Sequence, residues 1–184
     1  MDIDRYILTY GGLSHGLFVL LFLRHITKIN SKKNILLLGH IFVVATMVIR
    51  SFPTYRESLI STVTGVTGHT LILLFFVVSS FIYNDTYRIT FSKGNDWLNT
   101  LCMLGQLGMI MYYGILYINT NYKDVYEKYK GILVRLSVIT FLLLVIFYYR
   151  IALKQRKSGI LMYPLGMICG LYILLLVKEL SLSY

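Results

Sequence analysis

Three histidines in otherwise apolar segments are the residues of this sequence best suited to chemistry. His15, His40 and His69 stand in the stretches LSHG, LGHI and TGHT, one in each of the first three apolar runs. Each has a neighbour with a small side chain, which lets another helix or a flat ligand approach the ring. Histidine titrates near neutral pH, relays protons and binds metals. The three together therefore predict a functional site.

The apolar runs that hold these histidines have the length of membrane-spanning helices. The chain has 184 residues, of which 57% are apolar and 14% charged, whereas a soluble domain carries about 25% charged residues. Runs of about 20 apolar residues cross roughly 30 Å of hydrocarbon, and these runs lack the alternation of barrel strands. The sequence predicts an all-α, polytopic integral membrane protein that forms one transmembrane domain over 1–184. The six predicted spans are residues 7–27, 34–52, 59–83, 97–118, 131–153 and 159–177, joined by short loops.

The basic residues favour one orientation of this bundle. Of the 18 Lys and Arg residues, ten lie beside the first, third and fifth loops. By the positive-inside rule these loops are cytoplasmic, and both termini lie on the non-cytoplasmic side. The net charge of +10 fits anionic lipid headgroups better than nucleic acid. With the Lys, Asn, Ile and Tyr usage of an AT-rich genome, we expect a bacterial cytoplasmic membrane or an organellar inner membrane.

Polar residues at the depth of the histidines extend the predicted site. Counted along the spans, all three histidines lie near the bilayer midplane. Gln106 of the fourth span is near the same depth, where its amide can hydrogen-bond an imidazole, and Thr62 shares a face with His69. Arg135 and Arg50 are expected to form an electropositive outer vestibule that favours anions. The predicted ligand or pathway residues are His15, His40, His69, Gln106, Thr62 and Arg135.

Three functions remain open from this pattern. The favoured one is binding or passage of a small solute or ion, because ionisable groups inside a membrane mark pathways. The second is a haem b-binding electron-transfer subunit, in which His15, His40 or His69 ligates the iron, and a zinc or copper centre with these three ligands is a related option. The third is an accessory or assembly subunit whose histidines only hold helices together.

Several features argue against an enzyme. The sequence contains no HExxH, Walker or GxGxxG motif. The predicted spans contain no Asp or Glu, which argues against a metallohydrolase and against a carboxylate-based proton pump. Cys102 and Cys169 lie in apolar runs, as small buried side chains do. Six spans are too few for an internally duplicated transporter, so we expect a homo-oligomer or a subunit of a larger membrane complex.

Small residues and one proline predict details of helix packing. Gly12 and Gly16 form a GxxxG motif in the first span, and Gly166 and Gly170 form another in the sixth. Such motifs let helix backbones approach closely in lipid. Pro164, early in the sixth span, is expected to kink that helix because it removes a backbone hydrogen bond.

Overall fold

The structure is a computed structural model that describes residues 3–25, 31–81, 96–154 and 159–181. Within these residues it is entirely helical. The helices are α1 (Ile3–His25), α2 (Ser31–Ser51), the short 3-10 helix η1 (Pro53–Tyr55), α3 (Leu59–Phe81), α4 (Asp96–Asn121), α5 (Lys123–Lys154) and α6 (Met162–Ser181). All except η1 are long and apolar enough to cross a membrane. The predicted all-α fold with six such helices is confirmed, and it is consistent with an integral membrane protein. The ends of the first and third predicted spans, residues 26–27 and 82–83, lie outside the described residues.

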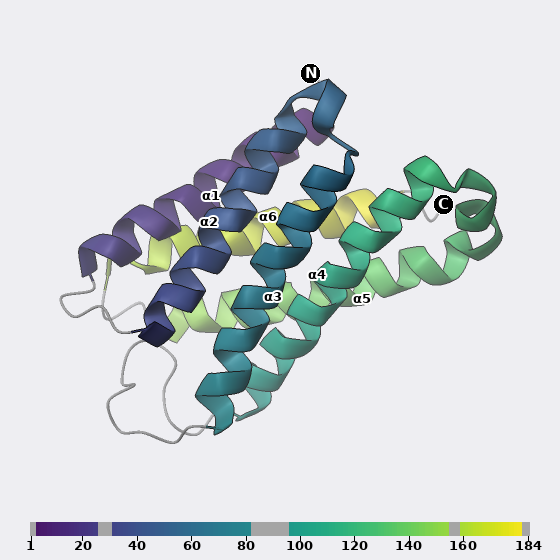
Figure 1. The fold of residues 1–184 in the computed structure, drawn as a ribbon. Helices are drawn as coiled ribbons and strands as arrows, with labels where there is room; N and C mark the ends of the chain where they lie inside the picture. Colours follow the sequence, from purple (N-terminus) through teal and green to yellow (C-terminus); the bar gives the residue numbers. More distant parts are fainter. Residues whose placement is uncertain (1–2, 26–30, 82–95, 155–158, 182–184) are drawn as a thin grey trace.

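The six long helices form a closed ring. Each one packs against its neighbours in the sequence, and α1 packs against α6. In Figure 1, α1, α2 and α3 lie side by side with α5 and α6 behind them. The start of α1 and the end of α6 lie at the same end of the bundle as the α2–α3 and α4–α5 connections, and Lys178 forms an ion pair with Asp4 there. We call this end the terminal end.

Aromatic and branched side chains fill the interior of the ring. Phe141, Leu144 and Phe147 of α5 and Ile168 of α6 are fully buried. Large apolar side chains also cover the outside, as Leu20 of α1 does. In lipid, van der Waals packing holds such helices together, because the surroundings are as apolar as the interior. A buried polar side chain in this bundle therefore needs an explanation of its own.

Helix α5 begins at Lys123, well before the predicted start at Gly131. Its 32 residues are about 48 Å long at 1.5 Å per residue, which exceeds the roughly 30 Å of hydrocarbon. Helix α5 is thus longer than one span requires, and Figure 1 shows the long α4–α5 hairpin projecting at the terminal end. Asp124 lies in the first turn of α5, where a carboxylate is favourable, and Glu127 is a good helix former.

Helix α6 is shifted toward the C-terminus relative to the prediction. It follows Gly159, whose φ of 71° is a left-handed conformation suited to glycine, and it begins at Met162. Pro164 then lies in the first turn, where a backbone N–H has no helical partner to lose. Pro164 therefore removes no helical hydrogen bond, and the predicted kink of this helix has no physical cause. The helix continues to Ser181 and includes Glu179, which the predicted end at Val177 had left in the tail.

Candidate functional site

The three intramembrane histidines face the interior of the bundle from adjacent helices. His15 of α1, His40 of α2 and His69 of α3 are 1%, 2% and 1% exposed. The rings of His15 and His40 are in contact, with centroids 5.3 Å apart. His69 lies within electrostatic range of both. We call these three side chains the histidine cluster.

Two glycines bring α2 and α3 together beside the cluster. A Cβ atom on Gly39 would lie 2.9 Å from the carbonyl oxygen of Gly68, and one on Gly68 would lie 3.0 Å from the carbonyl oxygen of Gly39. Only glycine at both positions allows the backbones to come so close. These small residues therefore serve helix contact rather than access for a flat ligand. Gly16, beside His15, has no such neighbour within 4 Å.

Hydrogen bonds fix the tautomers of two of the rings. Nδ1 of His40 lies 3.0 Å from the carbonyl oxygen of Leu36, and Nδ1 of His69 lies 2.7 Å from Oε1 of Gln106. A carbonyl oxygen only accepts, so both Nδ1 atoms donate, and in a neutral ring Nε2 then carries a lone pair. Neither Nε2 has a hydrogen-bond partner among the described residues, and neither ring nitrogen of His15 has one.

The histidine cluster therefore has more acceptors than donors. A neutral His15 supplies one N–H group and one lone pair, and the other two rings each supply a lone pair. A buried polar group without a partner costs about 1–3 kcal/mol. A proton, or a small molecule with N–H or O–H groups, would satisfy these lone pairs. A ligand that only accepts hydrogen bonds would not.

Gln106 of α4 orients His69. Its side chain is fully buried, and its amide nitrogen points toward Sγ of Cys102, 4.0 Å away, and toward the hydroxyl group of Tyr148. With the nitrogen directed to these two groups, the amide oxygen faces His69. The ring of Tyr113 also lies beside the imidazole, with its centroid 5.6 Å from that of His69. Helices α3, α4 and α5 thus all help to hold this imidazole.

Two of the predicted site residues lie apart from the histidine cluster. The hydroxyl group of Thr62 donates to the carbonyl oxygen of Ser58 in the preceding turn, and Thr62 precedes His69 by about two helical turns. Arg135 is exposed on α5, beside the exposed Ile132. The structure thus brings together His15, His40, His69 and Gln106, but not Thr62 or Arg135.

The sequence analysis did not predict the buried carboxyl group that lies at the terminal end. Glu179 of α6 is only 7% exposed, and the hydroxyl group of Tyr112 donates a hydrogen bond to its carboxylate. The signal was present in the helical spacing, because Glu179 follows the buried Leu171 and Leu175 at intervals of four residues. Such residues share one face of a helix.

Basic and acidic side chains occur together at the terminal end. The guanidinium group of Arg50 lies 5.8 Å from the ring centroid of Tyr113, and Lys178 pairs with Asp4. The carboxyl groups of Asp4 and Glu179 lie at the same end, and Arg135 is exposed on α5. The electropositive vestibule stays a prediction.

Comparisons with models of protein families, with curated proteins and with solved structures found no match to this chain. The geometry of the site is therefore the basis for every functional interpretation that follows.

Haem and metal centres fit this arrangement poorly. A porphyrin ligated by two imidazoles lies between them, but the rings of His15 and His40 touch each other, and Phe18 stacks on His40 at 4.4 Å. Among the residues in the described ranges, no group of three or more His, Cys, Asp or Glu side chains is placed to hold a metal ion. The packing suits a ligand much smaller than a porphyrin.

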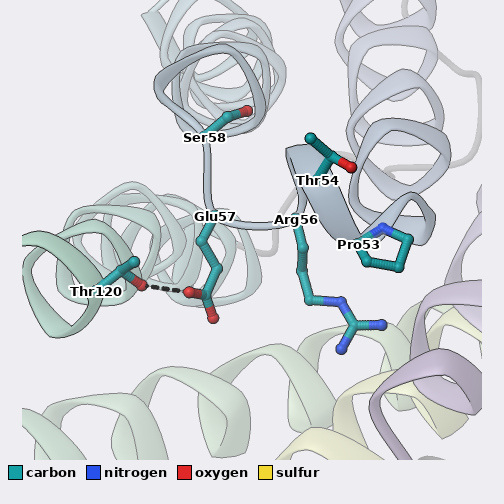
Figure 2. Close-up of a pocket in the computed structure, with 6 residues that line it drawn as sticks. All are labelled: Pro53, Thr54, Arg56, Glu57, Ser58 and Thr120. Carbon is teal, nitrogen blue, oxygen red and sulfur yellow. Dashed lines mark hydrogen bonds between the residues drawn. The ribbon is translucent and has the colours of Figure 1, made fainter.

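A polar pocket of about 680 Å³ opens at the surface of the terminal end (Figure 2). Its lining residues are Pro53, Thr54, Arg56, Glu57, Ser58 and Thr120. The hydroxyl group of Thr120 donates to Glu57 over 2.7 Å, and Nε of Arg56 donates to the carbonyl oxygen of Arg50. Ser58 lies roughly 16 Å along α3 from His69. The pocket is therefore separate from the histidine cluster.

Proposed function

We propose that this protein binds and passes a small ion at the histidine cluster within the membrane, and that the ion is the proton. One observation carries the proposal. His15, His40 and His69 are buried together, and four of their ring nitrogens have no hydrogen-bond partner among the described residues. An imidazole side chain can accept and release a proton, and ionisable groups inside a membrane mark pathways.

The spacing of the rings supports a proton over a larger solute. His15 and His40 are in ring contact, which suits a ligand that needs no cavity. A charged imidazolium in an apolar interior requires hydrogen-bond acceptors around it. The lone pairs on Nε2 of His40 and His69 are such acceptors. A proton taken up by one ring is thus stabilised by the others and is passed between them.

The wider setting follows the sequence-based expectations. We expect the terminal end to face the non-cytoplasmic side of a bacterial cytoplasmic membrane or an organellar inner membrane, since the basic loops lie at the opposite end. A homo-oligomer or a larger membrane complex remains the expected assembly. The proton pathway itself needs only one chain, because every residue that forms the cluster comes from one ring of helices.

The test is proton flux into liposomes that contain the purified protein and a pH-sensitive dye. His40→Asn and His69→Asn are the decisive variants, because the asparagine amide keeps a donor near the position of Nδ1 and removes the titrating Nε2. His25→Asn is the matched control, since His25 stands at the end of α1. We expect wild type and His25→Asn to conduct, and the other two variants to fall to the rate of empty liposomes.

Other outcomes would overturn the proposal. Wild-type flux no faster than that of empty liposomes would do so, as would conduction by His69→Asn and His40→Asn at the wild-type rate. A reduction-sensitive Soret band in the purified protein would favour the haem b function instead. Variants that lose only their association with a partner subunit would favour the accessory function.

A further inference from the structure

The carboxyl group of Glu179 is buried at the terminal end, and it is not part of the histidine cluster. It is as buried as the apolar core around it. In lipid surroundings, a carboxyl group on the inner face of a helix bundle is costly and marks a functional position.

The groups around Glu179 come from every helix packed near it. Tyr112 of α4 donates a hydrogen bond to the carboxylate. Tyr126 of α5 lies within its electrostatic range. On its own helix, the adjacent Lys178 pairs with Asp4 of α1. Lys178 thus acts on Glu179 through its charge while it pairs with Asp4, and Tyr112 contacts Glu179 through a hydrogen bond.

Aromatic side chains connect Glu179 to the histidine cluster. Tyr113 follows Tyr112 on α4, and the two rings touch edge to face with centroids 6.3 Å apart. The ring of Tyr113 in turn lies beside that of His69. Tyrosine hydroxyl groups both donate and accept hydrogen bonds. From the terminal end inward, the groups are thus the carboxyl group of Glu179, the phenols of Tyr112 and Tyr113, and the imidazole of His69.

We propose that Glu179 exchanges protons between the water at the terminal end and the histidine cluster, through Tyr112 and Tyr113. This inference rests on the proposed function. A proton from water binds a carboxylate oxygen of Glu179 and neutralises it. On inward transfer the carboxylate recovers its negative charge, and Nε2 of His69 gains the proton. The guanidinium group of Arg50 lies beside Tyr113 on this path.

The experiment compares Glu179→Gln with Glu57→Gln in the liposome assay. Glutamine keeps the shape of Glu179 and still accepts the hydrogen bond from Tyr112, but it cannot carry the proton. Glu57 is a matched control, because it is a carboxylate at the same end whose partner is Thr120. We expect Glu179→Gln to lose flux to the level of empty liposomes and Glu57→Gln to keep the wild-type rate.

The outcomes separate this inference from the proposed function. If wild type conducts, His69→Asn does not, and Glu179→Gln conducts like Glu57→Gln, the role of Glu179 is overturned and the histidine pathway stands. If wild type does not conduct, the proposed function itself fails. Infrared difference spectra between acidic and alkaline buffer give a second readout, the C=O band of a protonated carboxyl group, which Glu179→Gln should remove. Should that variant not fold, Tyr112→Phe must shift this band, and an unchanged band overturns the inference.

Discussion

Gly39 of α2 and Gly68 of α3 lie backbone against backbone, and each directly precedes a histidine of the cluster. The contact fixes the separation of α2 and α3 at the level where His40 and His69 leave their helices. The glycine that precedes His40 and the glycine that precedes His69 thus allow close helix packing, which brings the two imidazoles near each other.

A methyl group at this contact should force the helices apart. We expect Gly39→Ala and Gly68→Ala each to lower the free energy of unfolding by about 1–3 kcal/mol, the usual cost of overpacking. Unfolding by SDS in mild-detergent micelles, followed by circular dichroism, measures the change. The same variants should slow proton flux, because His40 and His69 move apart.

Gly16→Ala is the control for these substitutions. A Cβ atom at Gly16 meets nothing within 4 Å, although Gly16 also stands beside a histidine. Its unfolding free energy should change by less than about 0.5 kcal/mol. Equal losses in all three variants would show that glycine matters for helix flexibility rather than for the α2–α3 contact.

The hydrogen bonds predict the tautomers of the rings. His40 and His69 should carry the proton on Nδ1 when neutral, because each Nδ1 donates to a carbonyl oxygen. Nitrogen NMR of protein labelled on histidine distinguishes the two ring nitrogens and checks this directly. Gln106→Leu should abolish the preference at His69 alone. A majority of Nε2–H tautomer at His40 or His69 in the wild type would contradict the structure.

Arg135 and Thr62 should be dispensable for flux. Arg135 is exposed among apolar residues on α5, and the hydroxyl group of Thr62 is bonded within its own helix. Liposomes with Arg135→Gln or Thr62→Val should therefore conduct at the wild-type rate, whereas His69→Asn should not. A large loss in Arg135→Gln would mean that an electropositive vestibule exists after all, built by a second copy of the chain.

The orientation of the terminal end can be measured by cysteine labelling. The native Cys102 and Cys169 are buried and would be replaced by serine. We expect Thr54→Cys, in the surface pocket, to react in intact cells with a maleimide that cannot cross membranes. Ser92→Cys, in the predicted third loop, should react only after permeabilisation. The reverse pattern would place the terminal end in the cytoplasm.

Hydropathy was sufficient to predict six spanning helices, because lipid demands both length and apolarity from each. It was less informative about which face of a helix points inward. When lipid-facing and buried residues are equally apolar, periodicity gives little contrast. Arg135 was therefore assigned to an outer vestibule from its charge, whereas the buried residues of α5 around it are Val134, Ser137 and Phe141.

The end of α6 shows a second limit of reasoning from apolar runs. The run stops at Val177 because a lysine and a glutamate follow. In the fold, both charges have partners: Asp4 from the opposite end of the chain holds Lys178, and Tyr112 holds Glu179. Neither partner is near α6 in the sequence. Gln106 could be placed beside a histidine from depth alone, but a buried carboxylate needs a partner that only the fold supplies.

The closure of the ring has a consequence for biosynthesis. Helices α1 to α5 each find their neighbour as soon as the next helix leaves the ribosome, but α1 must wait for α6. Until then the nascent protein is an open sheet of helices in the lipid, with Asp4 not yet in contact with Lys178 and the interior polar groups accessible from one side. The bundle is complete only when α6 packs against α1 and Lys178 reaches Asp4.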